Sequence, residues 1–186
     1  MDSTLAFAKS GAPVASGVAS PASRVAFAAA LIALATVLGL VEAALPPLAV
    51  VPWLKPGLAN IAVVMALSAS GPFVAGAVSG GRIVIIGLAT GTLAGPASGM
   101  AFAGAAASLF VMWGLSRAWG SLSPVGWSAA GSAAHVCAQL LAAATMLDSP
   151  SLLALIPGSV LIALPLGALI GSLARYLVSR LPWRQA

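Results

Sequence analysis

One stretch of the chain, residues 123–141, carries polar side chains at helical spacing within an otherwise apolar run. Four of them would share one face of a helix, because they recur at intervals of four, three and four residues: Ser128, Ser132, His135 and Gln139. Such a face offers hydrogen-bond donors and acceptors, but a lone histidine does not make a metal site. The spacing therefore predicts either one wall of a ligand cavity or a set of hydrogen bonds between helices.

Arg82 is the sharpest single signal, because it lies inside another apolar stretch. A charge near the centre of a bilayer costs about 2.5–3.5 kcal/mol on insertion scales, so it persists where it faces a cavity, a partner or an anion. We interpret Arg82 as a guanidinium presented to a phosphate or carboxylate. The alternatives are a structural pairing with Glu42 and an arginine that reaches back to the interface. Gly80 and Gly81 precede Arg82 and predict a weakened or broken helix.

Several residues are expected at the mouth of a cavity, around the loop that follows the first apolar stretch. Asn60 is expected either to contact a ligand there or to cap and link helices. Glu42 and Lys55 flank the loop and are expected to lie at the entrance of the cavity, or else simply to be solvated. Trp127 is expected to stack near the same entrance.

The composition indicates the environment that surrounds these side chains. Of the 186 residues, 61% are hydrophobic and only 6% are charged, whereas about a quarter of the residues of a soluble globular protein are charged. The chain is therefore predicted to be an all-α integral membrane protein with one domain. Its eight basic residues are scattered without interleaved aromatic side chains, which excludes a nucleic-acid partner.

The acidic residues are too few for most catalytic sites. Only Asp2, Glu42 and Asp148 are acidic, so neither paired catalytic carboxylates nor a magnesium-binding cluster is expected. The sequence has no glycine-rich phosphate loop followed by lysine and serine or threonine, which argues against ATP hydrolysis. The single cysteine, Cys137, excludes an intrachain disulfide and a cysteine metal cluster. We therefore expect no enzyme activity of the chain by itself, and no cofactor or metal.

Long apolar stretches predict six transmembrane helices. They are residues 25–45, 57–70, 73–90, 97–115, 123–147 and 152–178. The second is short for a full crossing, and an alternative with five spans merges it with the third. Pro157 and Pro165 are expected to kink the sixth span.

The transmembrane domain is expected over residues 24–180, between two cytoplasmic tails. Residues 1–23 are predicted to be a disordered tail, with a cleaved signal peptide as the alternative, and residues 181–186 form the second tail. Six basic residues fall on the side of the termini: Lys9, Arg24, Arg117, Arg175, Arg180 and Arg184. Lys55 is the basic residue expected on the other side. The positive-inside rule therefore places both termini in the cytoplasm, in a multi-pass protein of the cell inner membrane.

Several segments occur in the order of one family's motifs, across about residues 25–178. These are residues 55–61 (KPGLANI), residues 82–91 (RIVIIGLATG), Ser108 with Val111 and Met112 within residues 98–112, residues 123–126 (SPVG) and residues 131–139. In these segments the chain resembles the Gx transporter family, also labelled heptaprenyl diphosphate synthase component I. His135 and Gln139 match the family pattern, whereas Val136 and Ala138 stand where it has an asparagine and a glycine.

The resemblance implies a six-helix bundle like that of the S components of energy-coupling factor transporters. Such S components bind vitamins or cofactor precursors and work with a T subunit and ATPases. Four small residues of the first span would allow close approach of a partner helix, and the resemblance implies that they face the T subunit: Ala26, Ala29, Ala30 and Ala33. The label implies instead an association with the catalytic subunit of a prenyl diphosphate synthase.

Together these features predict a non-catalytic, substrate-binding membrane subunit of a small-molecule transporter, for an anionic or amphipathic ligand. The residues expected to bind the ligand are Asn60, Arg82, Ser128, Ser132, His135 and Gln139. One alternative is an accessory membrane component of a heptaprenyl diphosphate synthase, which serves a separate catalytic subunit. The other is a structural scaffold in which the polar face only links helices.

Overall fold

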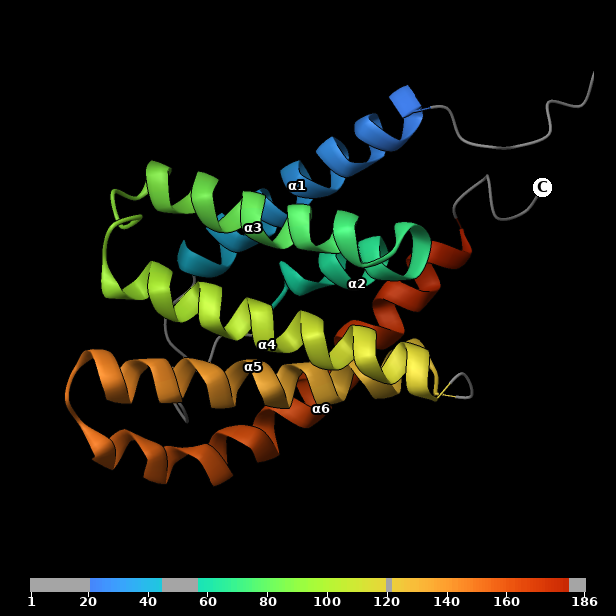
Figure 1. Ribbon diagram of the computed structural model, residues 1–186. Helices are drawn as coiled ribbons and strands as arrows, with labels where there is room; N and C mark the ends of the chain where they lie inside the picture. The colour runs from blue at the N-terminus through green and yellow to red at the C-terminus, as the bar shows by residue number, and fades with distance from the viewer. Residues whose placement is uncertain (1–20, 45–56, 120–121, 181–186) are drawn as a thin grey trace, which may run out of the picture.

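A computed structural model describes residues 21–44, 57–119 and 122–180, and this part of the chain is all-helical (Figure 1). Its elements are α1 (Pro21–Ala44), α2 (Asn60–Ser70), α3 (Pro72–Ala89), α4 (Pro96–Ala118), α5 (Pro124–Met146), the 3-10 helix η1 (Pro150–Leu155) and α6 (Ile156–Ser179). The first helix thus begins earlier than the expected residue 25. Residues 1–20 and 181–186 of the expected tails lie outside the described residues, and so does Lys55.

Among the described residues, five segments are long and apolar enough to cross a membrane: α1, α3, α4, α5 and the continuous stretch of η1 and α6. The short helix α2 differs, since its 11 residues span only about 16 Å, roughly half of a bilayer core. It remains a separate element, because Gly71 turns the chain with a positive φ of 87° between α2 and α3. The alternative that merges the two into one span is therefore wrong, and the chain is a multi-helix membrane protein.

The helices run in alternating directions, so the described ends of the chain lie on the same side of the bundle (Figure 1). Four basic residues belong to that side, at the start of α1 and the ends of α4 and α6: Arg24, Arg117, Arg175 and Arg180. Two of them cover aromatic rings, Arg117 over Trp113 at 5.9 Å and Arg180 over Tyr176 at 5.1 Å. That both termini face the cytoplasm stays a prediction from the positive-inside rule.

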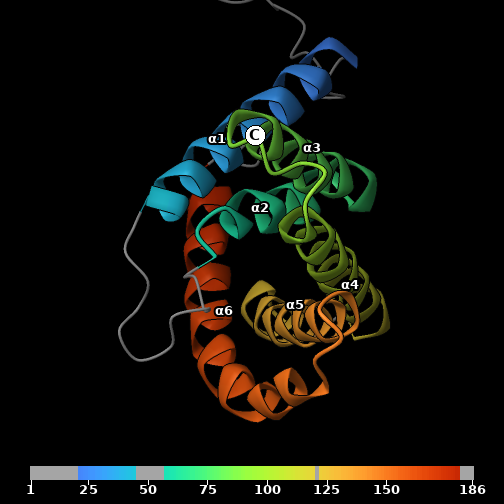
Figure 2. The same cartoon turned by 90° about the vertical axis from the view of Figure 1, so that its left-hand side faces the viewer.

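The short helix α2 lies at the centre of the first three helices, beside α1 and α3 (Figure 2). All residues from Ile61 to Leu67 are buried, as expected for a helix that is apolar on every face. They pack with Leu31 of α1, Val78 of α3 and Ile170 of α6 in one hydrophobic core. This core fixes the start of α2, and with it Asn60, inside the bundle.

The last three helices form a second group, in which α5 packs against both α4 and α6. Figure 2 shows η1 and α6 curving around α5. Pro157 lies in the first turn of α6, where proline is compatible with a helix, so it marks a beginning rather than a kink. Pro165 lies inside α6, which remains one helix.

The predicted break before Arg82 is wrong, because α3 is continuous from Pro72 to Ala89. Gly81 faces α1, where a Cβ atom would make an ordinary contact with the side chain of Ile32 at 3.4 Å. A continuous helix also keeps every backbone hydrogen bond within the segment, which a lipid environment favours. Arg82 is therefore held on a regular helix in the interior of the membrane segment.

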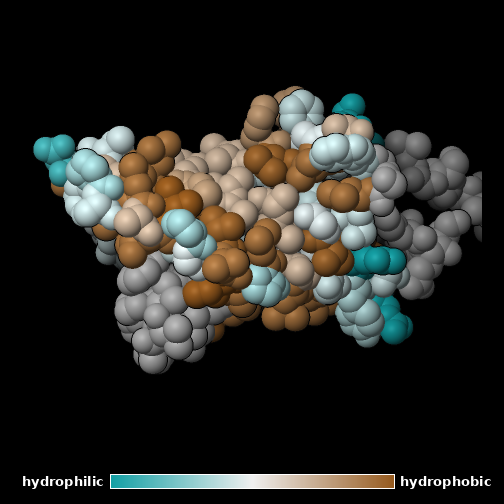
Figure 3. Space-filling model, turned by 90° about the horizontal axis from the view of Figure 1, so that it is seen from below, coloured by the Kyte–Doolittle hydropathy of each residue, from teal (hydrophilic) through white to brown (hydrophobic). Residues whose placement is uncertain are grey.

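The outer surface fits a lipid environment. Large apolar side chains such as Phe73, Phe110 and Leu161 are more than 70% exposed. Brown apolar residues cover much of the middle of the face in Figure 3, while the most hydrophilic residues lie towards its two ends. Polar side chains in the middle of the membrane-spanning helices are therefore expected to face the inside of the bundle rather than lipid.

Candidate functional site

A cavity of about 420 Å³ lies between the two groups of helices. Helices α1 to α3 form one wall and α4 to α6 the other. Its lining includes Glu42 near the end of α1, Asn60 at the start of α2 and Thr92 in the turn before α4. These positions belong to the half of the bundle that is remote from the described termini (Figure 1).

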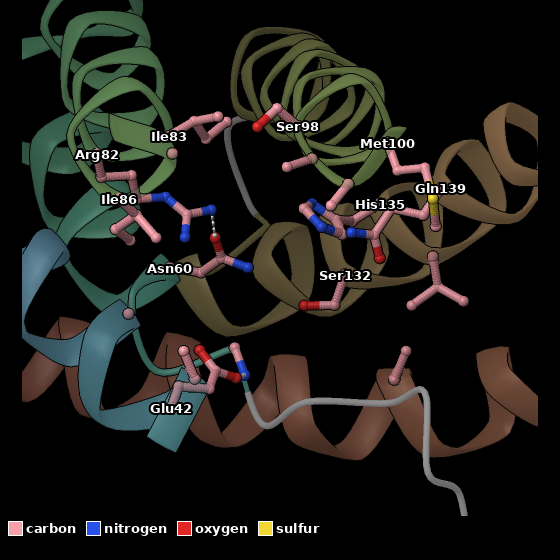
Figure 4. Close-up of a pocket in the computed structure, with 18 of the residues that line it drawn as sticks. Glu42, Asn60, Arg82, Ile83, Ile86, Ser98, Met100, Ser132, His135 and Gln139 are labelled. Atoms are coloured by element: carbon pink, nitrogen blue, oxygen red, sulfur yellow. Dashed lines mark hydrogen bonds between the residues drawn. The ribbon is translucent and has the colours of Figure 1, made fainter. Parts of the chain in front are cut away.

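The first wall carries Arg82 and Asn60, which meet in the interior (Figure 4). Arg82 donates from Nη2 to Oδ1 of Asn60, at 3.0 Å. Its Nε atom is buried and has no hydrogen-bond partner. The guanidinium is thus oriented by one contact and keeps a donor that the described protein does not satisfy, in a cavity that both residues line.

Glu42 lines the same cavity, and its side chain is only 7% exposed. This burial contradicts the alternative in which Glu42 is simply solvated, whereas its place at an entrance remains a prediction. Its carboxylate accepts a hydrogen bond from the backbone N–H of Gly57. Gly57 has a positive φ of 75°, which favours glycine, and the turn that it makes leads directly into Asn60. The carboxylate is therefore drawn inward by the same turn that positions Asn60.

The second wall carries three residues of the polar face predicted on α5, namely Ser132, His135 and Gln139. They project towards the cavity from the side opposite Arg82 and Asn60 (Figure 4). Nδ1 of His135 is buried and has no hydrogen-bond partner. The two walls therefore each present one buried, unpartnered nitrogen.

Gly104 of α4 makes room for this wall. A Cβ atom at Gly104 would lie 2.8 Å from Nε2 of His135 and 2.7 Å from Cγ of Gln139. The absence of a side chain at this position lets both residues pack closely against α4. Gly104 is not among the residues predicted from the sequence, although it lies within the 98–112 segment that resembles a family motif.

Ser128 and Trp127 take other roles than those expected. Ser128 is only 2% exposed and donates from Oγ to the backbone oxygen of Gly167 in α6, at 2.8 Å. It lies outside the cavity lining and joins two helices. Trp127 is 5% exposed and belongs to the hydrophobic core with Met112 and Ile170, rather than to an entrance. Both differ from the prediction because α6 lies against the first part of α5.

The alanines expected at a partner interface are on the outside of α1. Ala26, Ala29, Ala30 and Ala33 are all exposed. The contact with a T subunit remains a prediction. Lys55, the other expected entrance residue, lies outside the described residues.

The remaining lining is largely apolar and was not predicted. Met100 of α4 and Leu166 and Ile170 of α6 cover part of the cavity. Ser98 also lines it, but its hydroxyl donates to the backbone oxygen of Thr92 at 2.9 Å. Within the described residues no group of three or more histidine, cysteine, aspartate or glutamate side chains is placed to hold a metal ion.

Comparison with known protein families gives a match that covers most of the chain. A sequence model of the family described as heptaprenyl diphosphate synthase component I matches residues 31–177. The matched range includes every residue that lines the cavity. No curated protein and no solved structure matches the chain.

Proposed function

We propose that this chain, which belongs to the heptaprenyl diphosphate synthase component I family, is a non-catalytic membrane subunit that binds a small amphipathic molecule through an anionic group. One observation carries the proposal: Arg82 and His135 line a single cavity, and each has a buried nitrogen, Nε and Nδ1 respectively, without a hydrogen-bond partner in the described structure. An unsatisfied buried polar group costs about 1–3 kcal/mol. A ligand that accepts hydrogen bonds from these nitrogens would recover that free energy.

The cavity suits such a ligand in size and chemistry. Its volume of about 420 Å³ is within the range of small-molecule sites. The guanidinium of Arg82 can form two parallel hydrogen bonds with a phosphate or carboxylate. Ser132 and Gln139 add neutral donors and acceptors, and Met100 and Leu166 offer apolar contacts for an uncharged part of the ligand.

As the first candidate, the subunit serves a transporter of the energy-coupling factor kind in the cell inner membrane. Glu42 and Thr92 of the lining belong to the half of the bundle away from the basic residues at the described ends of α1, α4 and α6. The positive-inside rule would assign that half to the extracytoplasmic side. The sequence has no nucleotide-binding loop, so a T subunit and ATPases would supply the energy. The exposed alanines of α1 would offer the T subunit a surface of small side chains.

The family's description favours a second candidate. A component I of heptaprenyl diphosphate synthase implies a separate catalytic subunit, which the chain would serve by holding or delivering an isoprenoid substrate. The chain has only three acidic residues, too few to supply aspartate-rich magnesium sites for prenyl transfer itself. The two candidate functions would then differ in the partner protein and share the same cavity.

Ligand binding is tested with the purified full-length protein in detergent. Native mass spectrometry would detect a co-purified small molecule, and thermal unfolding would be followed with and without candidate anions. We expect a bound ligand that is lost in Arg82→Gln and retained in Arg117→Gln, which removes an exposed arginine. No bound molecule, together with equal responses of both variants to the anions, would refute the binding role.

Affinity purification from native membranes separates the two candidates. Recovery of a T subunit and ATPases supports the transporter. Recovery of a prenyl diphosphate synthase without these subunits supports the accessory component. Replacing Ala29 and Ala30 by leucine should reduce recovery of a T subunit, because larger side chains on the exposed face of α1 would prevent close approach of a partner helix.

A further inference from the structure

We infer that the cavity takes a dipolar ligand, one small molecule that carries both an anionic and a cationic group and has no net charge. This inference rests on the proposed binding function and makes its ligand class more specific. It begins with two ionised side chains among the described residues that line the cavity, Arg82 of α3 and Glu42 of α1. With His135 neutral, the formal charges of this described lining cancel.

The two charges are held by different partners rather than by each other. Arg82 donates to Asn60, while Glu42 accepts the backbone N–H of Gly57. No ion pair within 4.0 Å joins Arg82 to Glu42 in the described structure, although the carboxylate acts electrostatically on the guanidinium. Figure 4 shows the two side chains at separate places in the lining of the cavity. Each charge thus remains available to a ligand group of opposite sign.

A ligand with charge of only one sign would match one of these residues and be opposed by the other. A free phosphate or carboxylate would gain from Arg82 and be repelled by Glu42, and a simple amine would meet the reverse. These interactions are strong in a site that excludes water, because the dielectric constant there is low. A dipolar molecule avoids the repulsion by placing its two groups at the two charges.

The unpartnered nitrogens indicate which end of such a molecule each wall takes. Arg82 Nε always carries a proton, and His135 Nδ1 donates in the tautomer that is protonated there. Both therefore suit the anionic end. Glu42 has only one hydrogen bond to the described protein and suits an ammonium group, which has several donors. Leu166 and Ile170 lie on the remaining surface and suit an apolar tail.

The test compares three probes with the same tail and different charges. They are hexyl phosphate, hexyl phosphoethanolamine and hexylamine, each titrated into the full-length protein in detergent while thermal unfolding is followed by tryptophan fluorescence. We expect hexyl phosphoethanolamine to stabilise the wild-type protein at a concentration about tenfold lower than either of the other two probes.

Two variants test which residue binds each charged group of the probe. Glu42→Gln keeps an acceptor for Gly57 and should change the preference to hexyl phosphate, whereas Arg82→Gln should change it to hexylamine. Asp148→Asn and Arg117→Gln remove the same charges from exposed positions and should leave the order of the probes unchanged. Asparagine also tolerates the positive φ of 46° at Asp148.

The outcomes separate this inference from the binding function. Tighter binding of hexyl phosphate than of hexyl phosphoethanolamine by the wild type, with the same order in Glu42→Gln, would overturn the dipolar ligand and leave the binding function intact. Stabilisation by none of the three probes would overturn both.

Discussion

The two groups of helices stabilise their polar residues in different ways. In α1 to α3, long-range hydrogen bonds connect the helices, from Gly57 to Glu42 and from Arg82 to Asn60. In α4 to α6, glycines let the helices approach, and the hydrogen bond of Ser128 to the Gly167 carbonyl joins α5 to α6. The first group therefore contributes charge to the cavity, and the second contributes a closely packed neutral wall. Substitutions in the two groups should have different consequences.

The largest effect is expected in the closely packed group, at Gly171 of α6. A Cβ atom there would lie 2.8 Å from the backbone oxygen of Pro124 and from Cα of Val125, neither of which can move without the helix. Gly171→Ala should destabilise the protein by about 3 kcal/mol, measured by thermal or denaturant unfolding in detergent.

Gly158 offers a matched control in the same helix. Nothing lies within 4 Å of a Cβ atom at this position, so Gly158→Ala should be neutral or stabilising by up to about 1 kcal/mol. Equal effects of the two substitutions would contradict close packing of α6 on α5.

The next effect is expected in the charged group, at Asn60. Asn60→Ala removes the acceptor of Arg82 Nη2 and leaves a half-buried charge with less hydrogen bonding. We expect a loss of about 2 kcal/mol in unfolding free energy and weaker ligand binding. Ser172→Ala, which removes an exposed hydrogen bond on α6, serves as the control. An Asn60→Ala variant as stable as this control would show that the link between α2 and α3 contributes little.

A smaller effect on stability but a clear one on binding is expected at Gly104. The atoms that a Cβ would meet belong to the side chains of His135 and Gln139, which can move towards the cavity. Gly104→Ala should therefore cost about 1–2 kcal/mol of stability and reduce ligand affinity, measured by titration. Gly114→Ala on the same helix has open space and should change neither quantity. Unchanged affinity in Gly104→Ala would separate His135 from the binding wall.

The smallest effects distinguish two serines of one helix face. Ser128→Ala removes a buried hydrogen bond to Gly167 and should lower stability by about 1 kcal/mol without changing affinity. Ser132→Ala should do the reverse, because its side chain lines the cavity. Unfolding and titration of both variants measure the contrast. The opposite result would mean that the polar face of α5 is divided at a different position.

Much of the fold follows from sequence properties that act locally. The length of each apolar run predicts the long helices, since a bilayer leaves few alternatives to a continuous helix. The spacing of polar residues predicts a shared face on α5, and three of its four members line the cavity: Ser132, His135 and Gln139. The family match confirms the resemblance that the motifs indicated.

Helix-to-helix packing decided the rest. Ser128 and Ser132 share one face of α5, but the backbone of α6 accepts the hydroxyl of Ser128, so only Ser132 reaches the cavity. The position of Glu42 near the end of an apolar run predicted a surface residue, yet its hydrogen bond with the backbone of Gly57 holds it inside. Spacing along one helix fixes which side chains share a face. Which helix covers that face depends on contacts between residues far apart in the chain.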